Sequence, residues 1–558
     1  MRKPDMQPKL FRVMKGYTKE QLAKDVVSGI IVAIIALPLS IALALASGVG
    51  PEQGIYTAIV AGFLISFFGG SRVQIAGPTA AFATIVAGIV ARNGMEGLIA
   101  ATIIAGILLI LMGVCHLGSL IKFIPYTITT GFTAGIAVTI VIGQLKDFLG
   151  LRYPAGTSAV ETLEKLEAVA ANIGTVNLQA VIVGAVCLAI LILWPYVSKT
   201  IPGSLIAVVA GILMVRLLHM NVNTIGDLYT ISSSLPAFHA PHLTLELIRN
   251  EFSDGFTIAI LAAIESLLSC VVADGMINSR HDSNMELVAQ GIGNIGSALF
   301  GGIPATGAIA RTAANIKNGG RTPIAGMVHA LVLLVVLVVL MPYAALIPMP
   351  TIAAILFMVA YNMCGWRNFV ILVKRAPASD VVVLVATFVL TVVFDLVVAI
   401  EVGMLFACVL FMKQMSDESS IRGWIYDPDK SDPEHALEMR TVPQQVRVYE
   451  ITGPLFFGVA DRIAQITLKS FTKCLIIRMR GVPAVDATAM QAMEALLETC
   501  KKKGVRLILS HVNEQPYRMM EKGGFADRLG RENFCQHIDD ALSLAESVIA
   551  EETESAMA

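Results

Sequence analysis

The stretch Gly301-Gly-Ile-Pro-Ala-Thr-Gly-Ala-Ile-Ala-Arg311 combines the glycines and proline of a loop with an arginine, inside a long hydrophobic region. Glycine breaks regular structure, and proline is tolerated in the first turn of a helix, where its missing N–H costs nothing. We therefore expect an unwound segment followed by a short helix that begins near Pro304. The start of such a helix offers unpaired N–H groups and a positive dipole end to an anion. Arg311 would add a full positive charge about two turns further on.

A second stretch, Arg72-Val-Gln-Ile-Ala-Gly-Pro-Thr-Ala-Ala-Phe82, has the same order of a break, a proline and small residues. The offset of 226 residues that takes Pro78 to Pro304 also takes Gly29 to Gly255, and both glycines precede apolar runs. Two landmarks at one offset indicate an internal repeat, although two unrelated proline kinks are the alternative. Interrupted hydrophobic segments at corresponding places in two halves are the best sequence signal for the substrate site of a secondary transporter.

The composition excludes a soluble enzyme for most of the chain. Of its 558 residues, 55% are hydrophobic and 15% are charged, against about 25% charged in soluble domains. The net charge of −1 indicates no nucleic-acid partner. The eight cysteines are scattered without a CxxC pair, which favours reduced thiols over a disulfide framework or a metal site.

The apolar segments predict fourteen passes through a membrane, two of them half-helices because a full span needs about 20 residues. A basic tail, residues 1–25, precedes them and favours a cytosolic N-terminus, and an even number of passes returns the C-terminus to the same side. The segments lie near 26–46, 53–69, 78–92, 96–115, 122–148, 176–197, 202–219, 254–275, 286–300, 304–316, 323–344, 347–373, 379–397 and 399–414. Residues 220–252 are predicted to be an external loop that joins the two halves.

After the last apolar segment the composition becomes polar. Residues 415–440 are rich in acidic side chains and are predicted to be a linker. Strand-like runs at 445–451, 474–479 and 505–510 then alternate with a helical pattern at 487–503, whose inner face would carry Met490, Met493, Leu496 and Leu497. Strands that alternate with helices predict a small α/β domain over residues 441–550.

Several strings along the chain resemble the SulP anion transporters, the sulfate permease family. They include Leu-Pro-Leu-Ser at 37–40, Gly-Ile-Tyr at 54–56, Ala-Gly-Pro-Thr at 76–79, Glu-Ser-Leu-Leu at 265–268 and Ala-Arg-Thr at 310–312. The pattern Asn284-x-Glu-Leu-x-x-Gln-Gly-x-x-Asn294 belongs to the same set, and the C-terminal domain resembles a STAS domain with Val485-Asp-Ala-Thr488 at its signature turn. Within the family the chain looks most similar to bacterial DauA-type transporters of C4-dicarboxylates.

The resemblance implies an all-α polytopic membrane domain, residues 26–414, with a seven-plus-seven inverted repeat and a UraA-like core and gate. The core would comprise 26–117 and 254–344, and the gate 118–219 and 345–414. It also implies an elevator-like cycle, a homodimer, a bacterial inner-membrane location with both termini cytosolic, and a cytosolic STAS domain that can bind a protein partner.

Arg311 is the first candidate for anion binding, because an intramembrane arginine is costly and needs a partner or an aqueous cavity. Pairing with Glu265 or Glu286, or snorkelling to the interface, is the alternative. Glu265 lies in an otherwise apolar helix, where burial disfavours a charged carboxylate, so it is the candidate for proton coupling. Its alternative role is to neutralise Arg311. Ser269, one turn later, resembles a second cation-site position of sodium-coupled relatives, which leaves H⁺ and Na⁺ both open.

Small residues at the two helix starts would let an anion approach backbone N–H groups. Close helix packing selects the same residue types. The candidates for substrate binding are Thr79, Ala80, Gly307, Ala308, Ile309 and Ala310. The resemblance adds Ala36 and Leu39 to these candidates, because they match positions where some animal relatives carry glutamine; both are apolar here, so they would contribute no polar contact.

Other polar residues favour structural roles. Glu286, Gln290 and Asn294 share one helix face and are expected to bond helix to helix or loop. The histidines have no metal-binding spacing, so they are expected to be packed or interfacial. In the STAS-like domain the phosphorylated serine of anti-sigma-factor antagonists falls at Ala487, which has no hydroxyl; Thr488 is an unsupported alternative.

These patterns predict a secondary transporter of a small anion, coupled to protons, to sodium or to a counter-anion, with membrane lipid around it and no cofactor. A C4-dicarboxylate ranks first, followed by sulfate and bicarbonate. No nucleophile-base motif or phosphate-cradling loop points to an enzyme. A nucleobase permease, which would have no use for Arg311, and a transport-inactive sensor with the STAS-like domain as output are the alternatives.

Overall fold

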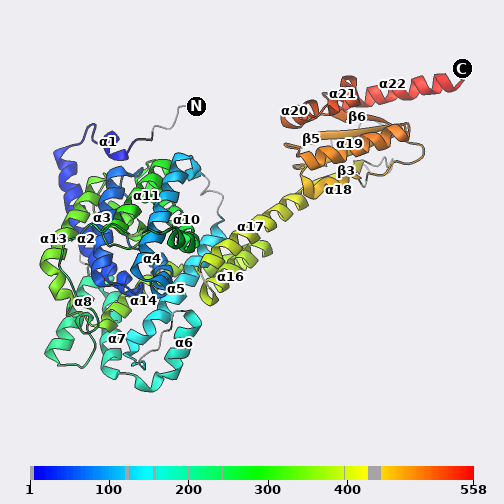
Figure 1. Ribbon diagram of the computed structural model, residues 1–558. Helices are drawn as coiled ribbons and strands as arrows, with labels where there is room; N and C mark the ends of the chain where they lie inside the picture. The colour runs from blue at the N-terminus through cyan, green and yellow to red at the C-terminus, as the bar shows by residue number, and fades with distance from the viewer. Residues whose placement is uncertain are drawn as a thin grey trace. The chain divides into compact units, whose positions relative to one another are not determined.

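The structure is a computed structural model that describes residues 6–119, 125–154, 159, 161–198, 202–241, 243–394, 396–424, 442–464 and 466–557. The chain divides into two compact units, residues 1–405 and 406–558, and each is described here by itself (Figure 1). The first unit is a helical membrane domain, and the second is a small α/β domain.

The first unit consists almost wholly of helices, apart from two short strands, β1 (Ala76–Gly77) and β2 (Thr306–Gly307). Its first half contains α1 (Lys9–Val13), α2 (Lys19–Ala46), α3 (Pro51–Phe68), α4 (Ala80–Val114), α5 (Tyr126–Leu149), α6 (Thr162–Ala171), the 3₁₀ turn Ile173–Thr175, α7 (Leu178–Val197) and α8 (Gly203–Leu217). Its second half contains α9 (Ile225–Leu228), α10 (Leu245–Ile277), α11 (Ser283–Leu299), α12 (Ile309–Lys317), α13 (Ile324–Ala344), α14 (Met349–Cys364), α15 (Trp366–Arg375), α16 (Ala378–Val393) and the start of α17 (Leu396–Glu418).

Each of the fourteen predicted apolar segments overlaps one or two of these helices, and the segment 347–373 covers both α14 and α15, which are separated at Gly365. With α14 and α15 counted as one, seven of the described helices are long and apolar enough to cross a membrane. The third and fourth predicted segments form the two parts of α4, which is broken at Gly94, where φ is 64° and ψ is −162°. Glycine is the residue that adopts this left-handed backbone at little cost. Residues 122–124, predicted to open the fifth segment, lie outside the described residues.

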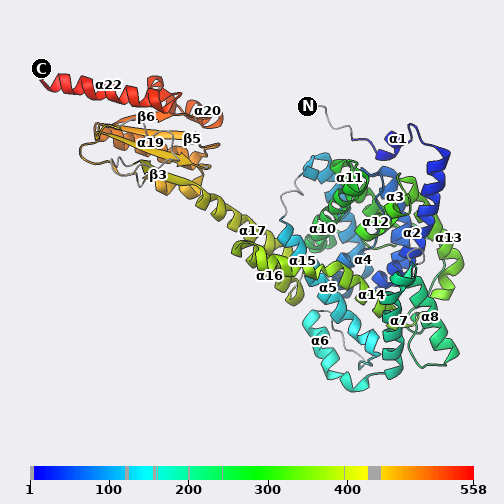
Figure 2. The same ribbon diagram turned by 180° about the vertical axis from the view of Figure 1, so that it is seen from behind.

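The helices form two packed groups, which correspond to the predicted core and gate. In the core, α4 packs against α10 and α11, α3 packs against α11, and α13 packs against α2 and α3. In the gate, α5 packs against α14 and α16, and α7 packs against α8 and α14. Helix α1 lies at one end of this unit, and α6, α7 and α8 lie at the other (Figures 1 and 2).

Two expectations about this unit are wrong. The helix predicted to begin near Pro304 begins at Ile309, because Thr306 and Gly307 are extended and pair with β1 instead. Arg311 therefore lies in the first turn of α12 and not two turns beyond its start. The loop predicted over 220–252 is also too long, because Thr244 caps α10 by accepting a hydrogen bond from Leu247 N at 3.2 Å, and residues 245–252 are helical.

The second unit has a five-stranded sheet in the order β3-β4-β5-β6-β7. Strand β3 is antiparallel to β4, and the other pairs are parallel. The strands are β3 (Ser420–Trp424), β4 (Val446–Thr452), β5 (Cys474–Gly481), β6 (Arg506–Ser510) and β7 (Phe534–Cys535). The helices are α18 (Ala460–Ala464), α19 (Ala487–Lys502), α20 (Glu514–Lys522), α21 (Phe525–Leu529) and α22 (Ile538–Met557), with 3₁₀ turns at Phe457–Val459 and Arg531–Asn533.

The predicted strands and helix of this unit are confirmed. Helix α19 starts after Asp486, whose side chain accepts a hydrogen bond from Ala489 N at 2.8 Å, and Ala487 is its first residue. The four predicted inner-face residues of α19 are buried in a core against one side of the sheet. Of the predicted linker, residues 415–418 belong to α17 and 420–424 to β3, whereas 425–440 lie outside the described residues.

Candidate functional site

The two predicted breaks lie side by side in the structure. Strand β1 precedes α4, strand β2 precedes α12, and the strands pair antiparallel, with Ala76 opposite Gly307 and Gly77 opposite Thr306. Ala308 N also donates to Ile75 O at 2.9 Å. Each strand is followed by its helix within two residues. Because the two strands are antiparallel and only two residues long, α4 and α12 begin at opposite ends of the same short ribbon. The internal repeat thus brings both helix starts to one place.

The first break is fixed by a buried carboxylate on α11. Glu286 accepts hydrogen bonds from the backbone N–H groups of Gly70 and Ser71 at 2.9 and 3.1 Å, and from the side chains of Gln74 and Gln290 at 2.8 and 3.0 Å. It is 0% exposed. These four bonds occupy the carboxylate with the loop before β1, which supports the predicted structural role of Glu286 and Gln290.

The second break is fixed mainly by amide and hydroxyl groups. Asn294 donates to Ala305 O at 2.9 Å and accepts from Ala305 N at 2.8 Å, which replaces the missing strand partner on that side. Thr57 Oγ1 accepts from Ile303 N at 2.7 Å, and Ser266 bonds Thr306 at 2.7 Å between their hydroxyls. Backbone that leaves a helix inside a membrane must be satisfied in this way.

Both helix starts lack a side-chain cap. Thr79 is the N-cap of α4 and Ala308 is the N-cap of α12, and neither side chain bonds a backbone N–H of its own helix. Ala80 is buried, whereas Ile309 and Ala310 are exposed and Ala308 is half-buried. The first turn of α12 therefore offers uncapped N–H groups beside an accessible surface, as an anion site requires.

Arg311 is 3% exposed and lies in that first turn. Its Nη2 donates to Pro78 O at 3.1 Å, directly before α4, so the side chain ties one helix start to the other. Its Nη1 has no hydrogen-bond partner, and among the described residues no carboxylate, including Glu265 and Glu286, forms an ion pair with it. A buried charge without a counter-charge costs several kcal/mol, so the position favours a bound anion.

Helix α10 connects both helix starts through the two predicted coupling residues. Glu265 accepts a hydrogen bond from Thr79 Oγ1 at 3.0 Å, at the start of α4. One turn later Ser269, which is 1% exposed, donates to Thr312 Oγ1 at 3.4 Å, on α12. Protonation of Glu265 would thus act directly on the N-cap residue of α4. Among the described residues no cluster of three His, Cys, Asp or Glu side chains could hold a metal ion.

Ala36 and Leu39 lie on α2, which packs against both α4 and α12. Ala36 is 0% exposed and Leu39 is half-buried. Both are apolar, so neither position adds a polar contact.

The sequence interpretation missed one ionisable residue of this region. His329 on α13 was expected to be packed, and it is 0% exposed, but neither ring nitrogen has a hydrogen-bond partner. The signal that could have singled it out is the one used for Glu265: an ionisable side chain within an apolar span.

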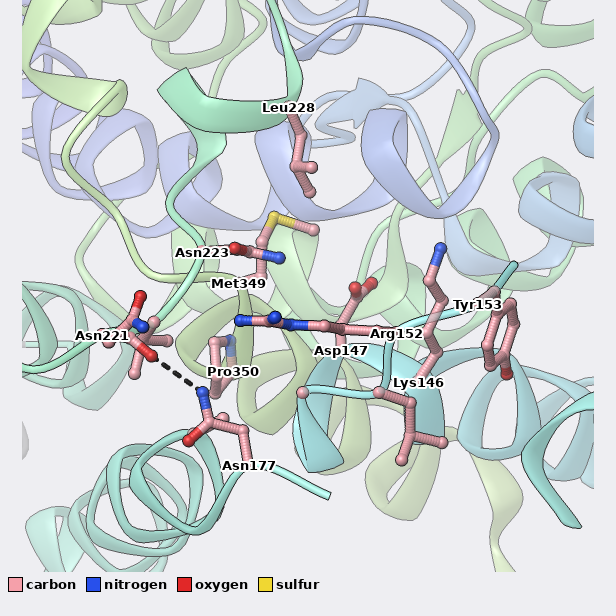
Figure 3. Close-up of a pocket in the computed structure, with 14 residues that line it drawn as sticks. Lys146, Asp147, Arg152, Tyr153, Asn177, Asn221, Asn223, Leu228, Met349 and Pro350 are labelled. Atoms are coloured by element: carbon pink, nitrogen blue, oxygen red, sulfur yellow. Dashed lines mark hydrogen bonds between the residues drawn. The ribbon is translucent and has the colours of Figure 1, made fainter. Parts of the chain in front are cut away.

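A separate pocket of about 240 Å³ lies elsewhere in this unit (Figure 3). It is formed at the C-terminal end of α5, the start of α7 and the start of α14, and Asn177 donates to Asn221 O across it at 2.7 Å. Its charged lining residues are Lys146, Asp147 and Arg152. None of the predicted site residues lines it, so this pocket is distinct from the paired helix starts.

Comparison with protein families gives two matches. The model of the sulfate permease family matches residues 22–387, and that of the STAS domain matches residues 438–541. "Putative sulfate transporter YvdB" of Bacillus subtilis is 40% identical over 94% of this chain and 98% of its own length. The bicarbonate transporter BicA of Synechocystis is 32% identical over 90% of each chain.

Solved structures agree with these matches. The transmembrane domain of a cyanobacterial BicA covers 69% of this chain and 98% of its own, with 32% identity and a TM-score of 0.63. Murine Slc26a9 in an inward-facing state covers 97% of this chain and 94% of its own at 20% identity, with a TM-score of 0.87, and so shows the same fold. The chain is therefore a multi-pass membrane protein that belongs to the sulfate permease family of anion transporters and carries a STAS domain.

Proposed function

We propose that this protein is a secondary active transporter that carries a small anion across the bacterial inner membrane by an elevator-like movement of the core against the gate. The observation that carries the proposal is the position of Arg311, which is buried between two uncapped helix starts and has no carboxylate partner in the part of the chain that the structure describes. A bound anion would supply the missing negative charge and accept hydrogen bonds from the exposed first turn of α12.

Proton coupling is proposed to run through Glu265. Its carboxylate bonds Thr79 at the start of α4, while Ser269 bonds α12, the helix that carries Arg311. Helix α10 thus contacts both helix starts, so anion binding there can affect the protonation of Glu265. Neutralising Glu265 as the anion binds would let the loaded core cross the membrane with less uncompensated charge. Sodium in place of the proton is the alternative, because a carboxylate and hydroxyl groups are also sodium ligands.

For the substrate, we rank bicarbonate and sulfate ahead of a C4-dicarboxylate. The DauA-type resemblance placed dicarboxylates first, but the relatives compared above are named as sulfate and bicarbonate transporters. The site also favours a compact anion, since Arg311 concentrates the positive side-chain charge at one point between the helix starts. A C4-dicarboxylate separates its two charges and would be served better by a second cationic group.

The remaining parts of the proposal concern the whole protein. The basic tail favours cytosolic termini. Relatives named as transporters support a role without enzymatic catalysis. A homodimer, and a cytosolic protein partner for the STAS domain, are proposed from the family resemblance.

Uptake by purified protein in liposomes tests the proposal. Labelled bicarbonate, sulfate, succinate and uracil are each offered with and without an inward proton gradient, and again with a sodium gradient. We expect uptake of bicarbonate or sulfate that the proton gradient accelerates. Uptake of uracil alone would support a nucleobase permease, and no uptake of any solute would support a sensor.

A further inference from the structure

His329 is a buried ionisable side chain for which the proposed transport cycle has no role. It lies on α13, is 0% exposed, and both of its ring nitrogens lack a hydrogen-bond partner. Burying a polar group without a partner costs free energy, and most such groups in folded proteins find a protein or water partner. The position therefore indicates an additional partner for the imidazole.

His329 lies behind the strand that leads to the first break. A Cβ atom added at Gly62 on α3 would come 3.9 Å from His329 Nδ1 and 3.3 Å from the carbonyl oxygen of Ala76 in β1. A Cβ atom added at Gly77, the next residue of β1, would come 2.5 Å from Arg311 Nη1 and 3.7 Å from α3. The imidazole of His329 and the unpaired nitrogen of Arg311 thus lie next to neighbouring residues of β1, Ala76 and Gly77, and next to the same part of α3.

A third unpaired polar group lies where α3 and α13 meet. Ser66 Oγ on α3 is buried and has no partner. A Cβ atom added at Gly326, one turn before His329 on α13, would collide with Ser66 Oγ, so the two helices touch there. A guanidinium donor, an imidazole and a hydroxyl provide the two to four polar partners that an internal water needs.

We propose that His329 is a positioning residue for Arg311, and that one buried water joins the imidazole to Arg311 Nη1. The proposal rests on the proposed function, because its consequence is for anion binding. The two side chains make no direct hydrogen bond, so the link needs a bridging molecule. The water accepts from Arg311 Nη1–H and donates to the unprotonated nitrogen of the neutral ring.

The neutral form of the ring follows from its neighbours. A second positive charge beside the buried Arg311 guanidinium would be unfavourable, which favours the neutral ring. On the facing helices, α3 presents Gly62 and Ser66 to this part of α13, and α2 presents Gly29 to the adjacent turn. The water bridge fixes one arm of the guanidinium while Pro78 O holds the other.

The replacements His329→Gln and His329→Leu test this role through liposome uptake. Glutamine keeps a hydrogen-bond acceptor near the ring position, whereas leucine fills the space with apolar atoms. We expect His329→Leu to raise the KM for the transported anion about tenfold, and His329→Gln to stay within about threefold, with Vmax of both within about threefold of the parent. A structural role for His329 predicts the opposite order, since leucine suits a buried site better than an unsatisfied amide. That order would overturn the proposal.

A second measurement does not depend on transport. Melting midpoints in detergent are measured for His329→Leu, Arg311→Gln and the double variant. We expect His329→Leu to lower the midpoint by about 2 °C in the parent and by less than half of that beside Arg311→Gln, because the bridge is already lost. Additive shifts would reject the water bridge even if transport is normal. Coupled shifts in a protein that transports none of the tested anions would retain the bridge and reject the proposed function.

Discussion

The segment that leads into α4 and the segment that leads into α12 contribute one strand each to the same short ribbon, and each contains a proline and an uncapped helix start. They differ in charge. The third residue of α12 is Arg311, whereas the third residue of α4 is Phe82, which is 1% exposed. The offset of 226 residues that relates the two prolines also takes Leu39 on α2 to Glu265 on α10. The repeat therefore supplies a symmetric frame, while the charged groups come from the second half.

The far ends of the two half-helices show a related difference. Asp25 on α2 is buried and accepts five hydrogen bonds, one of them from Thr322 Oγ1 at 2.5 Å, just beyond α12. The same offset takes Asp25 to Glu251 on α10, which bonds Asn93 next to the Gly94 break of α4. Glu251 Oε2 has no partner. A carboxylate of the first half thus holds the end of α12, and a carboxylate of the second half holds the end of the first part of α4. The end of α12 is held by more hydrogen bonds.

The largest effect on transport is expected at Arg311. Arg311→Gln removes a charged donor worth about 1.5–3 kcal/mol, which corresponds to about a ten- to hundredfold rise in the KM for the anion. The matched change in the first half, Phe82→Leu, should lower stability by less than about 1.5 kcal/mol and leave the KM within about threefold. Concentration-dependent uptake into liposomes measures both. If the two changes raised the KM equally, the proposed difference in anion binding between the two halves would be wrong.

Glu265→Gln should separate transport from its driving force. The amide can still accept the hydrogen bond from Thr79 but cannot take up a proton, so anion exchange should persist while acceleration by a proton gradient is lost. Counterflow of labelled anion and gradient-driven uptake are compared in the same liposomes. Unchanged acceleration by the proton gradient would assign the coupling to another group.

Replacement of Asp25 and of Glu251 should lower the stability of the protein by different amounts. Asp25→Ala removes the acceptor of five hydrogen bonds, and of the five donors Gln21 alone keeps a second acceptor, Gly319 O. The change should reduce the free energy of unfolding by at least about 3 kcal/mol, whereas Glu251→Ala should cost about 1–3 kcal/mol. Thermal unfolding in detergent gives the order of the two variants. A larger loss for Glu251→Ala would show that the α4 end is the more firmly held.

The smallest effect is expected at Leu39, the counterpart of Glu265. Leu39→Ala removes apolar contacts from a half-buried position and should cost about 1–2 kcal/mol of stability, with the KM and its response to a proton gradient unchanged within about twofold. The same uptake assays measure it. A changed response to the proton gradient would place a coupling role in the first half as well.

The sequence was sufficient for the parts of this arrangement that depend on composition and on local breaks. Apolar run length located the helices, and the two prolines located the two breaks. The sequence could not predict that Thr306 and Gly307 are extended, because that depends on pairing with Ala76 and Gly77, more than 200 residues away. For the same reason it placed Arg311 too far from the start of α12.

Which polar groups meet was also beyond the sequence. Glu265 stood out as a charge in an apolar helix, but whether it bonds Arg311 or Thr79 depends on how α10 packs against the two breaks. His329 carried the same signal but was expected to be packed or interfacial, because the histidines have no metal-binding spacing. Its missing partners become visible only when the neighbours on α3 and β1 are known.

Protection of a cysteine at the first turn of α12 tests the proposed anion site most directly. Ala310→Cys is made after Cys115, Cys364, Cys408 and Cys535, the cysteines that are not buried, are replaced by serine. Labelling by a charged thiol reagent should slow in proportion to occupancy as the transported anion is added, and Arg152→Cys in the separate pocket should label at an unchanged rate. Labelling of Ala310→Cys that stays constant at saturating anion would contradict a binding site between the two helix starts.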